Sequence, residues 1–468
     1  MNSLMRVAFV LFLNLFASAI TAQMTLSVSV PQYYTPILET LHVAGEFNDW
    51  NPASLNHVLV PQSDGTFLFV LDGWTDGAPF EFKFTRGDWA RVEGTATGGF
   101  LANRSVVFVN GGVLDLSIAG WEDFPGTPTA SGDLRVLSTV LPIPQLNRTR
   151  RVWVYLPADY TTSANFYPVV YMLDGQNVFD SATSFAGEWG VDESMESLPN
   201  GVVDAIVVAI DNGGAERINE YSAWENPQYG GGDAAAFADF LVNDLKPLID
   251  GLFRTQPGRT TTAVMGSSLG GLMAMYLVLE HGETFGKAGV MSPSFWFTNG
   301  IYTLAESHTV LPDTRIFMLG GTNESTTMVS NMEAMEAILV ERGYTEQNLR
   351  LEAHSYGQHN ENYWAGEYTP TYTWLFEGVA TAVPDLESKS LKAWPNPTND
   401  TLTVELNHSN AVAVFRVYDL NGRMVIEKRI QIAEHQLQIS VHDVPVGMYN
   451  GILEVEGAHY RVPFFRAP

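Results

Sequence analysis

The chain of 468 residues contains no cysteine. Disulfides, thiolate metal ligands and cysteine nucleophiles are therefore excluded. Basic residues are scarce as well, because 25 Lys and Arg stand against 52 Asp and Glu, giving a formal net charge of −27. Such a surface repels nucleic acids and anionic lipids, so we expect neither as a partner. A composition that is 46% hydrophobic is nevertheless that of a globular protein, and the length predicts two to four domains.

Long apolar runs are lacking after the N-terminus. There, Arg6 precedes an apolar run from Val7 to Phe16, and small residues continue to Ala22. This pattern predicts a secretory signal peptide over residues 1–22, because the run is too short to span a membrane. We therefore expect an exported protein.

Two predicted linkers divide the remaining chain into three regions. Residues 24–120 are short alternating segments separated by Gly, Asp, Asn and Pro, a pattern that predicts a β-sandwich. Residues 121–133 are rich in Pro, Gly, Thr and Ser and are a predicted linker. A second predicted linker, 381–391, precedes a nearly neutral, β-like region at 392–468.

The middle region, residues 134–380, alternates apolar strand-like runs with helical stretches such as 233–250. Continuous apolar strands between helices predict an α/β fold with a mostly parallel sheet and helices on both faces. Strands are predicted at 150–157, 167–175, 202–211, 260–265, 287–293, 314–322 and 349–357.

The sequence TTTAVMGSSLGGLMAMYLVLEH, residues 260–281, contains the pattern G-x-S-x-G centred on Ser268. The pattern follows a predicted strand and opens a predicted helix, which is the setting of a nucleophile elbow. Such a turn exposes the serine hydroxyl at the start of the helix. A glycine-rich turn with a purely structural role is the alternative, and we favour Ser268 as a nucleophile.

A nucleophilic serine needs a base and an acid, which α/β-hydrolases place after later strands in the order Ser, acid, His. Glu324 follows the strand TRIFMLGG, and His359 follows LRLEAHSYG, so we expect them to be the acid and the base. Two backbone N–H groups should hold the developing oxyanion. We assign these to Leu269, which follows the serine, and to Gln176 in the loop LDGQNVF.

Other side chains are candidates for the walls of a substrate pocket. Phe295 and Trp296, in SPSFWF, follow a strand at the carboxyl edge of the sheet, where ligands bind in open α/β folds; packing in the core is the alternative. We expect Arg217 to pair with Glu220, and binding of a substrate carboxylate is its alternative role. His354 lies inside a predicted strand and is expected to be structural.

Residues 134–380 resemble the α/β-hydrolase "putative esterase" group, which includes esterase D, enterochelin esterases and feruloyl esterase domains. The resemblance implies serine ester hydrolysis by Ser268, Glu324 and His359, with no metal or organic cofactor. In feruloyl-esterase relatives the acid is typically Asp in a G-T-N-D setting, and Glu324 departs from this pattern. The motifs that carry the resemblance are YPVVYMLDGQNVFD, GEWGVDESM, AIDNGGAERINEYS, MGSSLGGLMAMY, GVMSPSFWF, LGGTNES and GQHNENYW.

The N-terminal region contains VAGEFNDWNP, FEFKFTRGDWARVEG and FLANRS, which together resemble starch- or glycogen-binding carbohydrate modules. The resemblance implies that Trp50, Lys83 and Trp89 grip a glucan, with Asn103 as a further candidate. Tryptophans in a sandwich core and a module that acts only as a spacer are the alternatives.

The C-terminal region contains AWPNPTNDTLTVEL, VYDLNGRMV and VPVGMYNGILEVEG. It resembles the C-terminal sorting domain of type IX secretion systems, which implies an immunoglobulin-like β-sandwich that serves as an export address. A plain β accessory domain is the alternative.

Together these patterns predict a secreted or cell-surface serine esterase. Its expected substrates are acyl groups, acetyl or feruloyl, on polysaccharides or oligosaccharides, with a glycan bound by the N-terminal module and the secretion machinery by the C-terminal domain. Two alternatives stay open. The chain could be a siderophore trilactone esterase, or a non-catalytic glycan-binding surface protein with a vestigial hydrolase fold.

Overall fold

The computed structural model describes the chain from residue 22 to residue 466 with short gaps. The predicted signal peptide, except its last residue, and most of the predicted linker at 381–391 lie outside the described residues. The residues not described within this range are 32, 63–64, 125, 164, 382–390, 392, 395–397, 399, 407–410, 419–423, 433–434, 445–446 and 456–457.

The chain forms two units. The first comprises the chain up to Val30 together with Leu41–Glu93 and Phe100–Ala119. The second comprises Pro31–Thr40, Gly94–Gly99 and the chain from Gly120 onward.

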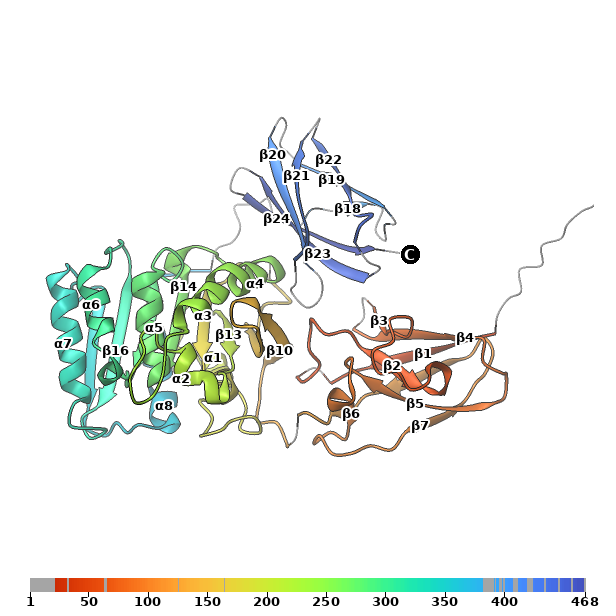
Figure 1. The fold of residues 1–468 in the computed structure, drawn as a ribbon, viewed down its shortest axis with the longest axis horizontal. Helices are drawn as coiled ribbons and strands as arrows, with labels where there is room; N and C mark the ends of the chain where they lie inside the picture. Colours follow the sequence, from red (N-terminus) through yellow and green to blue (C-terminus); the bar gives the residue numbers. More distant parts are fainter. Residues whose placement is uncertain are drawn as a thin grey trace, which may run out of the picture. The chain divides into compact units, whose positions relative to one another are not determined.

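Strands dominate the first unit (Figure 1), because apolar and polar residues alternate along them. Strand β5 illustrates the pattern, since Phe80, Phe82 and Phe84 are all buried. One sheet has the order β3 (Val60–Pro61), β4 (Phe67–Asp72), β1 (Gln23–Ser29), β8 (Val113–Ser117). The other has the order β2 (His42–Gly45), β5 (Pro79–Thr85), β7 (Arg104–Val107).

An eight-stranded mixed sheet forms the core of the second unit. The first two pairings at one edge, β10 with β11 and β11 with β13, are antiparallel, and the remaining five pairings are parallel. The central strands are buried along their whole length, which is why they are continuous apolar runs. The order is β10 (Asp133–Ile143), β11 (Arg148–Leu156), β13 (Ile206–Ile210), β12 (Val169–Leu173), β14 (Thr262–Ser267), β15 (Lys287–Met291), β16 (Arg315–Gly321), β17 (Leu349–His354).

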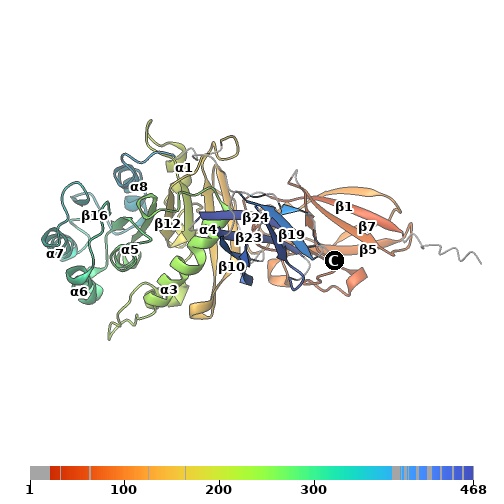
Figure 2. The same cartoon turned by 90° about the horizontal axis from the view of Figure 1, so that it is seen from above.

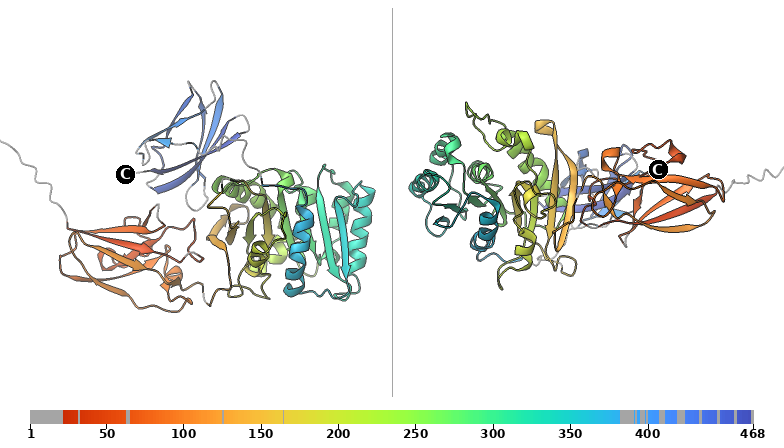
Figure 3. Two further views of the ribbon diagram at one scale, coloured as in Figure 1. Left: turned by 180° about the vertical axis from the view of Figure 1, so that it is seen from behind. Right: turned by 90° about the horizontal axis from the view of Figure 1, so that it is seen from below.

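Helices cover both faces of this sheet. Helices α1 and α8 lie on one face, whereas α3, α4 and α6 lie on the other (Figure 2). Seen from behind, α8, in blue, lies in front of the sheet (Figure 3). The helices are α1 (Val191–Glu196), α2 (Arg217–Glu220), α3 (Ala234–Phe240), α4 (Lys246–Leu252), α5 (Leu269–Glu280), α6 (Gly300–Ser307), α7 (Met328–Glu341) and α8 (Glu361–Leu375).

All seven predicted strands of the middle region occur as β11 to β17, within a few residues of their predicted ends. The predicted helix at 233–250 occurs as α3 and α4, joined by a π-helical stretch over Leu241–Leu245. Strand β10 was not among the predicted strands. It is the outer strand, and its register with β11 shifts twice, so its residues do not form a continuous apolar run.

The segment Pro31–Thr40 packs on this outer strand. The N–H groups of Ile37 and Leu38 donate to the carbonyl oxygens of Val136 and Leu137, both at 2.9 Å. The prediction assigns these residues to the N-terminal module at 24–120, whereas they belong to the second unit.

The described C-terminal residues form two antiparallel sheets around a core that includes Phe415 and Leu453. Among the described residues, none of the helices has the length and apolar character needed to cross a membrane. The first sheet contains β18 (Ala393–Trp394), β19 (Thr401–Glu405) and β22 (Gln436–Ser440), and the second contains β21 (Met424–Gln431), β20 (Val412–Tyr418), β23 (Gly447–Val455) and β24 (Ala458–Arg466).

Candidate active site

Ser268 lies in a strained turn between β14 and α5. Its backbone has φ 59° and ψ −120°, a conformation that is costly for any residue with a side chain. The turn is also tight, since a Cβ atom at Gly266 would lie 2.7 Å from the carbonyl oxygen of Gly270. The motif therefore needs glycine at position 266 because a side chain there would clash with the backbone of Gly270. The local geometry is that of a nucleophile elbow.

The side chains of Ser268, His359 and Glu324 form a hydrogen-bonded chain. His359 Nε2 lies 3.0 Å from Ser268 Oγ, and His359 Nδ1 lies 2.7 Å from Glu324 Oε2. The three residues follow β14, β17 and β16, whose carboxyl ends meet at one edge of the sheet. The structure thus brings together the three residues that the sequence singled out.

Glu324 is held rigidly as an acceptor. Its side chain is 1% exposed, and Oε1 accepts hydrogen bonds from the Gly321 N–H at 2.6 Å and the Ser292 hydroxyl at 2.8 Å. Burial raises the pKa of Glu324, but the hydrogen bonds from His359, Gly321 and Ser292 outweigh it and lower the pKa below its ordinary value. The carboxyl group is therefore ionised at neutral pH and faces the imidazole.

Two residues that the sequence analysis did not assign support this chain. Trp364 Nε1 donates to Ser292 Oγ at 2.8 Å, and its ring meets the His359 ring edge-on with centroids 5.1 Å apart. Trp189 packs on Trp364 with centroids 5.9 Å apart. Ser292 and Trp364 both lie in the quoted motifs GVMSPSFWF and GQHNENYW, but only tertiary contacts reveal what they touch.

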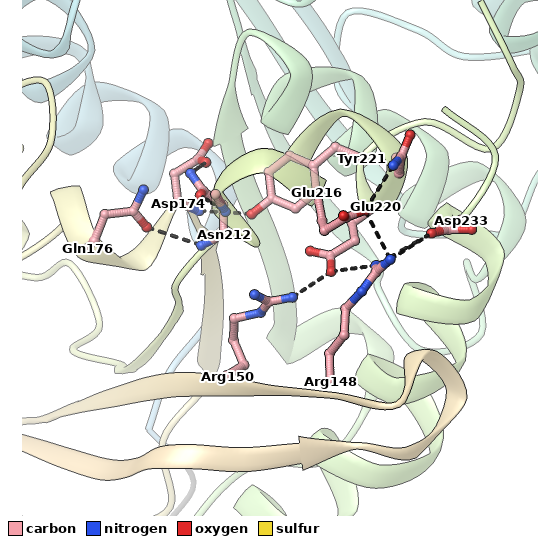
Figure 4. Close-up of polar contacts among 11 residues, drawn as sticks. Arg148, Arg150, Asp174, Gln176, Asn212, Glu216, Glu220, Tyr221 and Asp233 are labelled. Atoms are coloured by element: carbon pink, nitrogen blue, oxygen red, sulfur yellow. Dashed lines mark hydrogen bonds and ion pairs between the residues drawn. The ribbon is translucent and has the colours of Figure 1, made fainter. Parts of the chain in front are cut away.

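The two amides predicted for an oxyanion hole lie at neighbouring turns. Leu269 is the first residue of α5, where N–H groups have no partner within the helix. Gln176 lies in a short 3₁₀ turn after β12, which pairs directly with β14. The Gln176 side-chain oxygen accepts from the Asn212 N–H at 3.1 Å (Figure 4), which fixes this turn.

Asp174 anchors the same turn. It has a left-handed backbone with φ 57°, and its carboxylate accepts from Arg217 Nε and Nη2 at 2.6 and 2.8 Å and from Asn212 Nδ2 at 2.6 Å. Burial lowers the pKa of Arg217, but the ion pair with Asp174 outweighs it and raises the pKa. The Arg217 charge is thus matched by Asp174 within the protein.

The predicted pairing of Arg217 with Glu220 is wrong. Glu220 is fully buried and pairs with Arg148 at 2.9 Å and Arg150 at 2.5 Å, both from β11 (Figure 4). Arg217 and Glu220 are three residues apart on a one-turn helix, but residues far away in the sequence supply their partners. Asp174, in the turn after β12, pairs with Arg217, and strand β11 supplies the partners of Glu220.

The turn after β15 packs against the elbow. Ser294 donates its N–H to the Ser268 carbonyl at 2.9 Å, and its hydroxyl lies 3.3 Å from Ser268 Oγ. Phe295 is buried in the core against Tyr302, so its ring is not at the surface. Trp296 is 54% exposed and meets the half-exposed Tyr229 edge-on, with centroids 5.6 Å apart.

Two cavities occur among the described residues, and neither is lined by Ser268 or His359. A polar cleft of about 290 Å³ lies beside the His359 loop, with Gln358 and Asn360 among its lining residues. A second of about 320 Å³ is lined by Arg150, Asp211 and Asn212, among others. Because the His359 side chain is 41% exposed, the described site is an open surface.

Two groups of side chains have the spacing of metal ligands in the part of the chain that the structure describes. They are Glu352, His354 and Glu367, and Glu188, Asp192 and Glu193. In the first group, His354 Nε2 lies 3.1 Å from a Glu352 oxygen. Neither group includes the nucleophile or its two partners.

In the first unit, two of the four predicted carbohydrate-binding residues lie together. The rings of Trp50 and Trp89 have centroids 6.4 Å apart and planes inclined by 38°. Lys83 is buried, with Nζ 4.8 Å from the centre of the exposed Phe100 ring. The exposed Asn103 donates from Nδ2 to Glu81 Oε2 at 3.0 Å.

The α/β fold and the serine–histidine–carboxylate arrangement are features of serine hydrolases. Residues 143–375 match the family described as "Putative esterase". Residues 392–460 match the "Secretion system C-terminal sorting domain", the type IX sorting domain. The protein is a carboxylic ester hydrolase that is secreted or held at the cell surface.

Known proteins resemble different parts of the chain. It is 25% identical over 240 residues to the uncharacterized protein YbbA of Bacillus subtilis, covering 48% of this chain and 92% of that protein. It is 29% identical over 166 residues to the ferri-bacillibactin esterase BesA of the same organism, covering 32% of this chain and 54% of that esterase. It is 34% identical over 100 residues to an alpha-amylase of Niallia circulans, covering 21% of this chain and 8% of that enzyme.

Proposed function

We propose that the protein is a serine esterase in which Ser268, His359 and Glu324 act as nucleophile, base and acid. The observation that carries the proposal is the chain of two hydrogen bonds from Ser268 Oγ through His359 to Glu324, at 3.0 and 2.7 Å. The strained elbow and the departure of Ser268 from ordinary backbone geometry support it, because strain of this kind gathers at catalytic residues.

In this mechanism Ser268 Oγ attacks the ester carbonyl while His359 Nε2 takes its proton. Glu324 orients the imidazole through Nδ1 and stabilises the imidazolium that forms. The N–H groups of Leu269 and Gln176 hold the oxyanion. The imidazolium then protonates the leaving alcohol, and a water molecule activated by His359 releases the acid from the acyl-enzyme.

We propose acyl groups on polysaccharides or oligosaccharides, acetyl or feruloyl, as the substrate class. The open site, with His359 41% exposed, admits a bulky chain. The exposed aromatic pair of Trp296 and Tyr229 beside the elbow offers apolar faces on which a sugar or aryl ring can stack.

A panel of p-nitrophenyl acetate, methyl ferulate and acetylated xylan tests the chemistry. Ser268→Ala should abolish release from whichever substrate is hydrolysed. Ser294→Ala is the matched control, because it removes a hydroxyl 3.3 Å from Ser268 Oγ that makes no hydrogen bond to His359. Activity that persists in Ser268→Ala, or is lost equally in Ser294→Ala, would contradict the assignment of the nucleophile.

The second candidate is hydrolysis of siderophore trilactones. Its support is the match to the ferri-bacillibactin esterase, although the chain spans only about half of that relative. Against it, a chain of net charge −27 repels anionic iron catecholates. Serine-dependent cleavage of a catecholate trilactone, with none on acylated sugars, would favour this candidate.

We further propose that the first unit binds a glucan through Trp50 and Trp89, with Asn103 nearby. The adjacent indole rings support this role. Lys83 is the fourth candidate, and its ammonium group contacts the exposed ring of Phe100. Trp50→Ala and Trp89→Ala should each weaken retention on amylose at least tenfold, whereas Val113→Ala, exposed on the other sheet, should not. Equal retention by all three variants would contradict the role.

A further inference from the structure

Three carboxylates gather where the chain enters helix α1. Glu188, Asp192 and Glu193 each bring one oxygen within 4.8 Å of the others. Among the described residues, none of the three forms an ion pair with Lys, Arg or His. Three acidic groups this close repel one another unless something of opposite charge lies between them.

Asp192 is the unusual member of this group. Its side chain is fully buried; Oδ2 accepts from the Ser131 N–H at 2.6 Å, but Oδ1 has no hydrogen-bond partner. A buried carboxylate oxygen without a partner is expensive, and a cation beside Asp192 Oδ1 would offset this cost.

We propose that Glu188, Asp192 and Glu193 bind a calcium ion. Ca²⁺ takes six to eight oxygen ligands in flexible geometry, which suits three carboxylates supplemented by backbone carbonyls and water. The group offers neither nitrogen nor sulfur, the ligands that favour transition metals. A divalent cation would match the charges that the protein leaves uncompensated and would give Asp192 Oδ1 a partner.

The ion would fasten two parts of the esterase region together. Thr129 donates its hydroxyl to Glu188 Oε1 at 2.8 Å, and Ser131 donates its N–H to Asp192, so the residues leading into β10 already reach the carboxylates. Trp189, next to Glu188, packs on Trp364, whose ring contacts His359. Calcium would therefore order a loop that borders the catalytic histidine without taking part in the chemistry.

Thermal unfolding of the full-length protein tests the proposal. Oxygen sites in extracellular modules bind calcium with dissociation constants of about 1 mM or below, so 10 mM CaCl₂ should raise the melting temperature by about 3–6 °C over EDTA. Glu193→Gln and Asp192→Asn should abolish the shift. Glu352→Gln, in the other carboxylate group, is the matched control and should keep it.

A direct binding measurement complements the melts. Tb³⁺ replaces Ca²⁺ at oxygen sites and emits when a neighbouring tryptophan is excited, and Trp189 is adjacent in sequence to Glu188. Wild type and Glu352→Gln should show emission that Ca²⁺ displaces, whereas Glu193→Gln should show at least tenfold less.

Two results would overturn the proposal. One is a wild-type protein that shows neither a Ca²⁺-dependent shift in melting temperature nor Tb³⁺ emission that Ca²⁺ displaces. If Asp192→Asn then melts at a higher temperature than wild type in EDTA, the carboxylates share a proton instead of binding an ion. The other is an equal response in Glu193→Gln. Glu193 is exposed, so this variant keeps the test valid even if Asp192→Asn fails to fold.

Discussion

At the scale of single residues, Glu324, the acid of the proposed triad, is the most informative position. Glu324 reaches His359 from a turn after β16 while its other oxygen is fixed by Gly321 and Ser292. The length of the Glu324 side chain matters, because a shorter side chain could not keep its contacts with His359, Gly321 and Ser292 at once. Glutamate therefore has the side-chain length that this turn requires.

Glu324→Gln keeps the shape of the side chain but removes the charge that stabilises the imidazolium. We expect kcat to fall by about 10²–10⁴-fold with little change in KM, by analogy with neutralised acids in serine hydrolases. Steady-state hydrolysis of p-nitrophenyl acetate measures this. Ser292→Ala removes only one anchor and should cost less, and an unchanged kcat in Glu324→Gln would show that another group acts as the acid.

Asp204 permits a prediction about pH and stability. Burial raises the pKa of Asp204 to about 6 from an ordinary value of 3.8. The folded state thus holds this proton more tightly than the unfolded state, so the stabilisation is complete below pH 3.8 and is lost as pH rises to about 6. Asp204→Asn should be more stable than wild type at pH 8 by about 1–3 kcal/mol and lose this advantage at pH 4. Urea unfolding at both pH values measures the difference, and a pH-independent difference would contradict the assignment.

At the scale of elements, the predictions succeeded where local patterns carry enough information. Strands β11 to β17 are apolar runs between turns, and the order of the motif fixed which loops carry Ser268, Glu324 and His359. The partners of Arg217 and the contacts of Trp364 depend on residues far away in the sequence, which no local pattern encodes. Strand β10 was missed because its register with the next strand, β11, shifts twice and because the segment that covers it, residues 31–40, is far away in the sequence.

The elbow also depends on how closely α5 approaches the sheet. A Cβ atom at Gly271 would lie 2.8 Å from the Met291 carbonyl oxygen and 3.2 Å from Pro293 Cα, both backbone atoms. Gly271→Ala should therefore push α5 away from β15, costing about 1–3 kcal/mol and most of the esterase activity. Gly366→Ala, in α8, has open space around its Cβ and should be neutral or stabilise by about 0.5–1 kcal/mol. Thermal melts and activity assays of both variants measure this, and equal effects would contradict the close approach.

At the scale of the whole molecule, sequence order and structural units do not coincide. Residues 31–40 stand among those predicted for the N-terminal module, yet they pack on β10 and belong with the esterase sheet. Tyr34 stacks on Phe124 with ring centroids 4.6 Å apart and donates its hydroxyl to Asp180. The domain boundary predicted from composition did not separate residues 31–40 from the N-terminal module, because a ten-residue segment is too short to change the sequence pattern around it.

Leu38 provides the test of this arrangement. It is 1% exposed and belongs to the hydrophobic core of the eight-stranded sheet, so Leu38→Ala should leave a cavity in the esterase and cost about 2–5 kcal/mol. Leu55→Ala, 84% exposed in the first unit, is the matched control and should have no effect. Thermal inactivation of ester hydrolysis is the suitable measurement, because in a multidomain chain it reports on the esterase region specifically. If Leu38→Ala lost activity at the same temperature as Leu55→Ala and wild type, residues 31–40 would contribute nothing to the esterase, and the predicted boundary at residue 120 would separate two independent domains.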